Sequence, residues 1–409
     1  MRILTFTTLF PNEASPQHGI FVENRLRHLL ASGQVSARVV APVPWFPFAD
    51  DRFGHYAKFA RAPQREVRFG VTIDHPRYPL IPKVGMLPAP ALLYRAALRR
   101  VRALMAEGER FDLIDAHYFY PDGIAAAMLG RTLGLPVTIT ARGTDVNLIA
   151  DSPLPRRMIL WAADRAAGMI TVCAALKDRL VEIGVDGSRV TVLRNGVDLS
   201  FFRPHPDRAA ARAKYGIGAD DRGGLMLLSV GHLITRKAHD LVIQALAELP
   251  PDTRLLIAGE GPERGALTAL AERLGVASRV TFLGQRPQGD LPELYAAADI
   301  LVLASSREGW ANVLLEAMAC GTPVAASNVW GTPEVVAEPA AGVLVEPRTG
   351  AAFAAGISRL AAALPDRAAT RAYAEQFSWD ATTEGQLALF NGILSRNGRD
   401  ARVGEARAA

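Results

Sequence analysis

The sequence predicts an α/β protein of two domains, each a parallel sheet with helices on both faces. The chain has 409 residues, about twice the length of an ordinary domain. Short apolar runs alternate with helical patterns in both halves, and such alternation requires crossover connections between parallel strands. A polar, glycine-bearing stretch at residues 205–224 interrupts the alternation and predicts the domain boundary.

The first domain is predicted over residues 1–199. Its short apolar runs are typical of buried strands, and longer segments between them, such as 20–32 and 158–166, have the spacing of helices. The predicted strands are Ile3–Thr7, Ala37–Ala41, Leu113–Ala116, Val137–Thr140 and Met169–Val172.

The second domain is predicted over residues 200–379 and repeats this plan. Its predicted strands are Leu225–Val230, Leu255–Ala258, Val280–Leu283, Ile300–Leu303 and Val324–Ala326. A closing helix at about 380–395 is expected to pack back on the first domain, followed by a frayed tail over residues 396–409. Two such domains place the carboxyl ends of their strands across a cleft, where ligands bind.

The composition is that of a globular protein, with 49% hydrophobic and 21% charged residues. No run of 18 apolar residues is present, and the N-terminus predicts a strand rather than a signal peptide. The two cysteines, Cys173 and Cys320, lie far apart in apolar surroundings, which favours buried, reduced thiols. We therefore expect a cytoplasmic location.

Positive charge is concentrated in the first half. Residues 1–200 hold 25 Lys and Arg against 18 Asp and Glu, a net charge of +7, whereas the remainder carries −2. This asymmetry favours an anionic partner, such as a membrane surface, a phosphorylated lipid or nucleic acid. The alternative is a diffuse surplus that only keeps the protein soluble.

The segment from Ser305 to Gly321 contains two carboxylates, Glu308 and Glu316, with seven residues between them. A predicted strand precedes this segment, and a glycine-bearing loop within it turns into a helix. A free helix N-terminus binds anions through its unpaired N–H groups and its dipole. Because carboxylates accept hydrogen bonds from hydroxyls, the pattern predicts a site for a molecule that carries both phosphate and sugar.

Other strand ends of the second domain add polar groups to the same sheet edge. They carry Gly231, His232, Arg236, Lys237, Gly259–Pro262 and Gln285. Lys237 is suited to neutralising a leaving diphosphate. The alternative for Lys237 is a solvated lysine at the start of a helix.

In this arrangement the chain resembles the retaining, nucleotide-sugar-dependent glycosyltransferases of the GT-B fold, usually numbered family 4. The resemblance covers nearly the whole chain, and the paired glutamates are among its most specific parts. The others are Asn195–Pro204, Gly259–Pro262, Tyr295–Asp299 and Phe377–Trp379. The opening segment LFPNEASPQHGIFVEN is similar to transferases of bacterial surface polysaccharide assembly, including teichuronic-acid-type enzymes.

The resemblance implies a donor site in the second domain. Glu316 would bind the ribose hydroxyls, Glu308 would lie beside the transferred sugar, and Gly19 would let the backbone approach the donor phosphate across the cleft. The implied donor-binding residues are Gly19, His232, Arg236, Lys237, Gly261, Gly309, Trp310, Ala311, Asn312, Val313, Leu314 and Glu316. The implied catalytic residues are Glu308, Lys237, Arg142 and Asp145.

Several positions depart from the family pattern. His232 stands where arginine is usual, a single glycine at position 19 replaces a pair, and Arg142 replaces a histidine that often lies near the reacting centre. Arginine cannot act as a base at neutral pH, so Arg142 would act electrostatically on donor phosphate or on an anionic acceptor. Asp145 and His117 are candidates for contact with the acceptor hydroxyl. The alternative for His117 is a hydrogen-bonded residue at a strand end.

The family's usual mechanism implies front-face attack, in which the leaving phosphate takes the proton of the acceptor hydroxyl. No Asp-x-Asp triplet is present, so we expect Lys237 and the helix N-terminus to act in place of a metal, with no cofactor. The implied acceptor is a glycan or a lipid-linked molecule of surface polysaccharide synthesis.

Two features of the first half suggest peripheral contact with the inner face of an anionic membrane. They are the aromatic stretch Pro44–Phe48 and a predicted helix at Ala89–Met105 that carries Arg95, Arg99, Arg100 and Arg102. The alternative is a helix that faces the core and has a solvated arginine face.

Three other functions fit the sequence less well. A nucleotide-sugar epimerase could share the two-domain plan, but the paired glutamates and the linker favour transfer to an acceptor. A dinucleotide-dependent oxidoreductase requires Gly-x-Gly-x-x-Gly after a first strand, and neither half has it. No nucleic-acid-binding motif is present, so nucleic acid is not expected as a partner.

Overall fold

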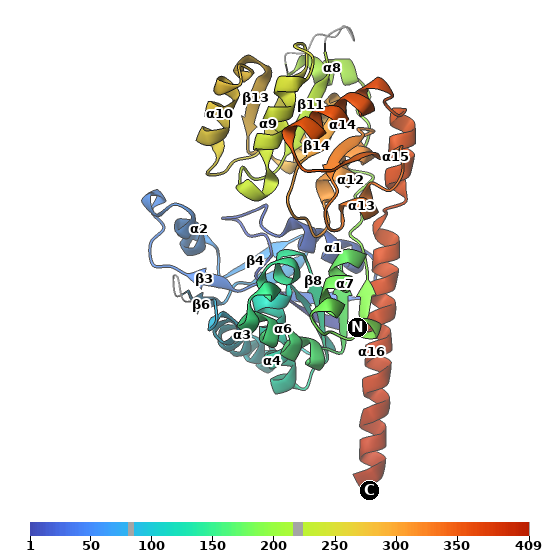
Figure 1. Cartoon of the computed structure of the whole chain (residues 1–409). Coiled ribbons are helices and arrows are strands. Elements are labelled where there is room, and N and C mark those ends of the chain that lie inside the picture. The colour runs from blue at the N-terminus through green and yellow to red at the C-terminus, as the bar shows by residue number, and fades with distance from the viewer. Residues whose placement is uncertain (81–85, 216–223, 409) are drawn as a thin grey trace. The chain divides into compact units, whose positions relative to one another are not determined.

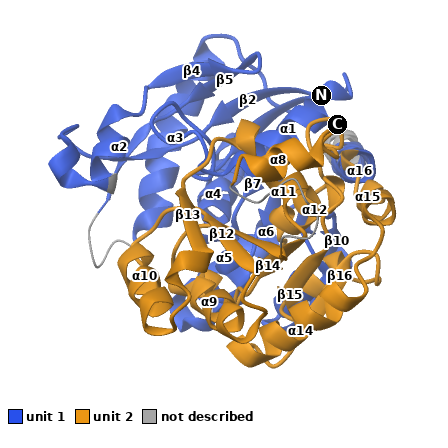
Figure 2. Cartoon of the chain, turned by 90° about the horizontal axis from the view of Figure 1, so that it is seen from above, with its two compact units in different colours: residues 1–194, 380–409 blue, residues 195–379 orange. Residues whose placement is uncertain are grey.

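The computed structural model describes residues 1–80, 86–215 and 224–408, which form two compact units (Figure 1). Unit 1 comprises residues 1–194 and 380–409, and unit 2 comprises residues 195–379 (Figure 2). The division thus falls immediately before the Asn195–Pro204 segment. Residues 216–223 of the polar stretch that predicted a boundary lie outside the described residues.

Unit 1 contains an eight-stranded sheet in the order β10-β9-β8-β7-β1-β2-β5-β4, parallel except for the β4–β5 pair. Its strands are β1 (Arg2–Phe6), β2 (Ser36–Val40), β4 (Arg65–Arg68), β5 (Val71–Asp74), β7 (Leu113–His117), β8 (Val137–Ala141), β9 (Gly168–Thr171) and β10 (Val190–Val192). A separate parallel pair is formed by β3 (Val43–Trp45) and β6 (Arg77–Pro79).

The helices of unit 1 follow the strands as parallel crossovers require. They are α1 (Ile20–Ala31), α2 (His55–Arg61), α3 (Ala89–Ala106), α4 (Ile124–Leu133), α5 (Thr144–Asn147), α6 (Pro153–Arg165), α7 (Ala174–Glu182) and α16 (Trp379–Ala408). The last of these comes from the far end of the chain. Its residues Leu387, Phe390 and Ile393 share one apolar core with Ile3 of β1 and Val22 of α1.

Unit 2 contains a six-stranded parallel sheet in the order β13-β12-β11-β14-β15-β16 (Figure 2). Its strands are β11 (Met226–Val230), β12 (Arg254–Ala258), β13 (Val280–Gly284), β14 (Ile300–Leu303), β15 (Val324–Ser327) and β16 (Gly342–Val345). Its helices are α8 (Arg208–Ala213), α9 (His239–Glu248), α10 (Arg264–Arg273), α11 (Leu291–Ala297), α12 (Asn312–Ala319), α13 (Thr332–Val335), α14 (Gly350–Ala362) and α15 (Arg367–Glu375).

The predicted fold class is confirmed, because both units are parallel α/β structures. Each of the ten predicted strands is present with ends that agree within one residue. The edge hairpin β4–β5 was not predicted, because its charged residues hide the apolar alternation. No helix within the described ranges has the length and apolarity needed to cross a membrane.

The C-terminal helix differs from the prediction. We expected it to end near residue 395 and to be followed by a frayed tail, whereas α16 continues to Ala408. The added stretch is rich in arginine and alanine, which have high intrinsic helix propensity.

Candidate functional site

A candidate site lies in unit 2, at the carboxyl ends of β11 and β14. The loop after β11 forms a short helical turn, Thr235–Lys237, and the loop after β14 carries Glu308. The N–H of Ser306 donates to the carbonyl of Arg236 at 2.9 Å, which joins the two loops. The parallel sheet therefore brings together side chains that lie about 70 residues apart in sequence.

Glu308 lies between two cations. The Nζ of Lys237 donates to its Oε1 at 2.6 Å, and the Nη1 of Arg236 lies 3.4 Å from the same oxygen. Glu308 is buried, with 9% of its surface exposed. Burial alone would raise the pKa of Glu308, but Lys237 and Arg236 outweigh it, so the pKa lies below its usual value. Glu308 is therefore a carboxylate at neutral pH.

The N-terminus of α12 follows this carboxylate directly. The first residues of any helix leave N–H groups without partners inside the helix, and the helix dipole adds positive potential there. Trp310 Nε1 donates to the carbonyl of Asn195 at 3.0 Å, and Asn312 accepts from the Asn195 side chain at 3.3 Å. The start of α12 is thus held by the first residue of unit 2.

The other predicted residues of this segment are parts of the same turn and helix. Ala311 and Leu314 are buried, whereas Gly309 and Val313 are half-buried. They can contribute backbone groups, since neither glycine nor an apolar side chain carries a polar group of its own.

Glu316 lies one turn further along α12. The hydroxyl of Tyr295 donates to its Oε2 at 2.7 Å, and burial raises the pKa of Glu316 to about 7. The two glutamates, on the same short segment, therefore differ: Glu308 is ionised by its cations, and Glu316 titrates near neutrality. Because Tyr295 donates to Oε2, the other oxygen, Oε1, is suited to accepting from a ligand hydroxyl.

The glycine turn at residues 259–261 packs against the loop after β11. A Cβ at Gly261 would lie 2.3 Å from the carbonyl oxygen of Leu233, so only glycine fits there. The N–H of Leu233 donates to the carbonyl of Glu260 at 2.9 Å. Gly261 thus holds the loop that carries Lys237, and His232 in the same loop is exposed.

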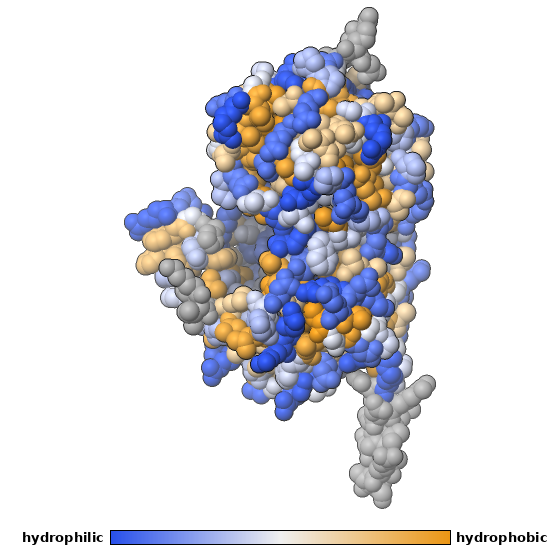
Figure 3. All heavy atoms as spheres, viewed as in Figure 1, coloured by the Kyte–Doolittle hydropathy of each residue, from blue (hydrophilic) through white to orange (hydrophobic). Residues whose placement is uncertain are grey.

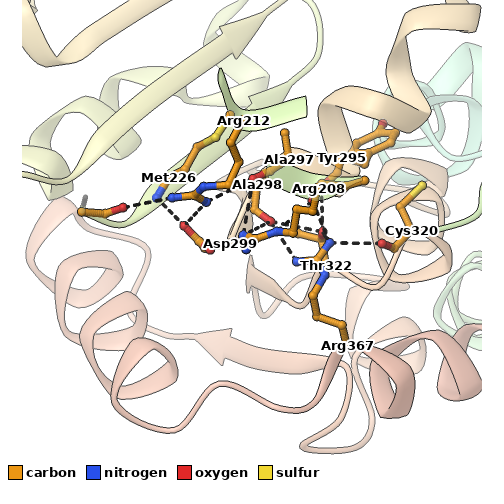
Figure 4. Close-up of polar contacts among 12 residues, drawn as sticks. Arg208, Arg212, Met226, Tyr295, Ala297, Ala298, Asp299, Cys320, Thr322 and Arg367 are labelled. Carbon is orange, nitrogen blue, oxygen red and sulfur yellow. Dashed lines mark hydrogen bonds and ion pairs between the residues drawn. The ribbon is translucent and has the colours of Figure 1, made fainter. Parts of the chain in front are cut away.

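A polar cluster at the opposite end of β14 supports α12 (Figure 4). Asp299 accepts hydrogen bonds from Arg208, from Arg212 Nη1 at 2.9 Å and from the backbone N–H of Met226 at 2.7 Å. Arg367 donates to the carbonyl of Cys320 at 3.1 Å, just beyond α12. This cluster holds the amino-terminal end of β14 and the carboxyl-terminal end of α12, and the opposite ends of these two elements carry the site.

Unit 1 has a polar cluster of its own at the carboxyl ends of β7 and β8. His117 is the last residue of β7, and Arg142 directly follows β8. Arg142 Nη2 lies 2.7 Å from His117 Nδ1, and Asp115 Oδ2 lies 3.3 Å from His117 Nε2. Because a guanidinium only donates, Nδ1 accepts from Arg142 and Nε2–H donates to Asp115.

The contacts of His117 bear on both interpretations given for it. Burial, together with the charge of Arg142, lowers the pKa of His117 to about 4. Its basic nitrogen accepts from Arg142, so the neutral ring supports Arg142, as the alternative of a hydrogen-bonded strand-end residue requires. Contact of His117 with an acceptor hydroxyl stays a prediction.

Three further residues extend this network and were not predicted. Asp115 accepts from Gln386 Nε2 at 3.0 Å, Gln386 Oε1 accepts from Arg25 Nε at 2.9 Å, and Arg25 Nη1 donates to the carbonyl of Leu193 at 3.1 Å. The Asp115-x-His117 spacing was a usable signal, because alternate residues of a strand share a face. Arg25 and Gln386 lie on α1 and α16, and nothing in the sequence pairs them.

Asp145 and Gly19 also have structural positions in unit 1. The buried carboxylate of Asp145 accepts from the backbone N–H groups of Phe119, Arg142 and Gly143, so it shapes the loop that carries Arg142. Gly19 has a φ of 70° and begins α1, and a Cβ there would lie 2.3 Å from the carbonyl of Leu9.

Asp122 is another carboxylate that sequence reasoning missed. Its Oδ2 accepts from the backbone N–H of Thr8 at 2.7 Å and from the hydroxyl of Thr7 at 3.2 Å. Burial raises the pKa of Asp122 to about 7. It ties the loop after β1 to the turn after β7.

The sequence matches two protein families. Residues 26–201 match the family described as Glycosyltransferase Family 4, and residues 210–377 match Glycosyl transferases group 1. The D-inositol 3-phosphate glycosyltransferase of Frankia alni is 34% identical over 363 residues, covering 81% of this chain and 86% of that protein. The protein of the same name from Segniliparus rotundus is 33% identical over 332 residues, covering 75% of this chain and 72% of that protein.

Solved structures agree with this assignment at the level of the fold. Anabaena Alr3699/HepE in complex with UDP and glucose has a TM-score of 0.73 and 22% identity, covering 96% of this chain and all of that one. Sucrose-phosphate synthase from Thermosynechococcus elongatus has a TM-score of 0.71 and 22% identity, covering 99% of each chain. The curated relatives are inositol phosphate enzymes, not the teichuronic-acid type that the opening segment suggested. This chain belongs to the glycosyltransferases, with a family 4 domain followed by a group 1 domain, and it has the GT-B fold.

Proposed function

We propose that this chain is a retaining glycosyltransferase that moves a hexose-type sugar from a UDP- or GDP-sugar to a hydroxyl of an anionic acceptor. The observation that carries the proposal is the Lys237–Glu308 pair at the start of α12, with Glu316 one turn further on. A cation and a helix N-terminus are suited to a diphosphate, and two carboxylates are suited to sugar hydroxyls.

On this proposal each group of unit 2 has one task. Lys237 and Arg236 bind the diphosphate, and Glu316 accepts hydrogen bonds from the ribose hydroxyls. Glu308 holds a hydroxyl of the transferred sugar and stabilises the positive charge that develops on its ring. The protein named in complex with UDP and glucose has the same fold, which supports a UDP-sugar as donor.

The contacts of His117 and Asp145 in unit 1 are compatible with front-face attack, in which the leaving phosphate acts as the base. His117 has a pKa of about 4, with its basic nitrogen occupied, and the oxygens of Asp145 accept backbone N–H groups. Neither residue is placed to remove a proton from an acceptor. We further propose that the reaction needs no metal, because Lys237 and the helix N-terminus already supply positive charge. Full activity after treatment with EDTA is the expected result.

The proposed acceptor is a small phosphorylated polyol of the inositol phosphate class. The names of the relatives suggest this class, and Arg142 supplies a cation at the carboxyl edge of the sheet in unit 1. A glycan or lipid-linked acceptor of surface polysaccharide synthesis is the second candidate, and an exposed aromatic segment of unit 1 favours it.

This aromatic segment comprises residues 45–61, from the end of β3 through α2. Trp45 and Phe48 are 58% and 52% exposed, and Phe48 stacks on Phe53 with 5.1 Å between ring centroids. Arg52 lies over the Phe53 ring, and Arg61 donates to the carbonyl of Ala49 in the same segment. Apolar and hydrophilic residues lie side by side on the visible part of α2 (Figure 3), a combination suited to the surface of an anionic membrane.

The predicted arginine helix, now α3, contributes less to this surface than expected. Arg95, Arg99 and Arg102 are exposed, but Arg100 is half-buried and donates to Asp74 at 3.0 Å. A lipid-binding test therefore uses Arg95, Arg99 and Arg102 together with Trp45. Co-sedimentation with anionic vesicles is expected to fall when these residues are replaced, and unchanged binding contradicts membrane contact.

The deciding experiment incubates the purified protein with UDP- and GDP-sugars, with and without inositol phosphates and lipid-linked glycans. Transfer is detected by mass spectrometry, and the anomeric configuration of the product by proton coupling constants. A product of inverted configuration refutes the retaining mechanism. An altered nucleotide sugar formed without any acceptor supports the epimerase alternative instead.

A further inference from the structure

A cavity of about 480 Å³ lies in unit 1, beside the edge hairpin β4–β5. Its lining comes from four elements: Arg65 on β4, Asp74 on β5, Arg77 on β6 and Arg100 on α3. None of its lining residues belongs to the donor or acceptor groups described above. The volume is in the range that holds small-molecule ligands.

One carboxylate of this cavity serves three guanidinium groups, of which Arg65 and Arg100 line the cavity and Arg38 does not. Asp74 is 3% exposed, and its Oδ1 accepts from Arg65 Nε and from Arg100 Nε, both at 3.0 Å. Its Oδ2 accepts from Arg38 Nε at 2.8 Å. Arg77 brings a fourth guanidinium to the same cavity. A single negative charge therefore faces four positive charges.

The other nearby carboxylates are already engaged. A carboxylate oxygen of Glu66 lies 2.7 Å from His75 Nε2. Glu109 forms an ion pair with Arg2 and lies 4.0 Å from Arg38. Glu107 accepts from Arg100 Nη1 at 3.2 Å, but its side chain is 54% exposed. Even when Glu107 is counted with Asp74, the four arginines exceed these two carboxylates by two positive charges.

Two guanidinium nitrogens of the cavity have no acceptor among the described residues. They are Nη1 of Arg77 and Nη2 of Arg100, and both are buried. Burial lowers the pKa of Arg77, as expected for a cation that lacks a countercharge. Buried donors are nearly always satisfied in folded proteins, so two unsatisfied donors on residues that line one cavity favour an acceptor bound beside them.

We propose that this cavity binds a phosphate monoester group as a dianion, at a site separate from the donor and acceptor sites. A phosphate offers several oxygens to the planar donors of Arg65, Arg77 and Arg100, and its charge balances the surplus. The volume leaves room for a small organic group on the phosphate. The source is either a free phosphorylated metabolite or the headgroup of a lipid such as phosphatidic acid.

The test measures binding of inorganic phosphate by isothermal titration calorimetry at constant ionic strength. Because Lys237 gives unit 2 its own anion site, the titrations use full-length protein that carries Lys237→Gln. Adding Arg77→Gln and Arg100→Gln is expected to weaken the remaining phosphate binding at least about 30-fold, since two charge-assisted donors are lost. Arg131→Gln, which removes an exposed arginine of unit 1, is the matched control and leaves binding unchanged.

Two further arms identify the source and guard against misfolding. Glycerol 3-phosphate and vesicles that contain phosphatidic acid are compared as ligands. If the Arg77→Gln, Arg100→Gln protein loses binding of one of them, the result supports the site and shows whether the phosphate comes from a free metabolite or from a lipid. Crystals soaked in tungstate, a tetrahedral dianion, are expected to show an anomalous peak between Arg77 and Arg100. An empty cavity in tungstate, or phosphate binding that the two substitutions leave intact in a folded protein, overturns the proposal.

Discussion

The contact between Lys237 and Glu308 predicts opposite effects of two substitutions on nucleotide binding. Lys237 Nζ lies 2.6 Å from the Glu308 carboxylate, and both side chains are largely buried, at 13% and 10% exposure. At an effective dielectric constant of about 20, the attraction at this distance is about 6 kcal/mol before desolvation is subtracted. Binding a diphosphate requires Lys237 to share or leave this partner.

Replacing Lys237 by Gln is therefore expected to weaken UDP binding by about 2–3 kcal/mol, or roughly 30- to 150-fold, because a charge-assisted hydrogen bond is lost. Replacing Glu308 by Gln releases Lys237 and removes a charge that repels phosphate. UDP is then expected to bind about threefold to tenfold more tightly. In the same Glu308→Gln protein, turnover with the nucleotide sugar falls by about two to three orders of magnitude, since the developing positive charge loses its carboxylate.

Calorimetry with UDP and steady-state kinetics measure both quantities. In the double variant, most of the gain from Glu308→Gln should vanish, because Lys237 is no longer there to be released. Lys214→Gln is the matched control, since Lys214 forms an ion pair of the same 2.6 Å length with Glu293 on an exposed surface. If Glu308→Gln weakens UDP binding as much as Lys237→Gln does, Glu308 does not compete with phosphate and the reasoning is wrong.

Three more predictions follow from the charges described above. The pKa of Glu316 is about 7, so its protonation should lower the affinity for a UDP-sugar about tenfold from pH 8 to pH 6. The Glu316→Gln protein should bind the UDP-sugar weakly and without this pH dependence. The Tyr295→Phe protein should keep most of the affinity. The pKa of His117 is about 4 in the folded protein, so its neutral form adds stability that is lost as the pH drops from about 6.5 to 4. The His117→Asn substitution should reduce this fall in Tm. The reduction should correspond to at most about 3 kcal/mol. Asp299→Asn leaves Arg212 buried without a full countercharge and should lower Tm by about 5–10 °C, whereas Asp290→Asn on the surface should not change it.

Most of the fold follows from local sequence. The apolar runs that predicted strands are buried on both faces, as parallel strands between two helix layers must be, and strand ends are set by the glycines and polar residues that follow. The edge hairpin β4–β5 escaped prediction because its alternating residues are charged and one face is solvated. The C-terminal helix was predicted too short because polar residues can extend a helix without any apolar periodicity.

The candidate site was predictable only in part. The segment from Glu308 to Glu316 is continuous in sequence, so its turn, helix start and carboxylates are visible without a structure. The partners that set the pKa values of these groups are not, because Lys237 and Tyr295 come from other loops and helices. The same limit concealed the role of His117, whose neutral state depends on Arg142, Asp115 and the burial around them.

The assignment of α16 to unit 1 has a consequence for biosynthesis. The ribosome makes Ile3, Arg25 and Asp115 before any of unit 2, whereas their partners Phe390 and Gln386 follow unit 2 in the sequence. All of unit 2 is therefore complete before unit 1 receives its final helix. Until then the earlier part of unit 1 lacks the apolar side chains of α16, and Arg25 and Asp115 each lack their contact with Gln386, so a chain that stops before residue 380 cannot complete this core.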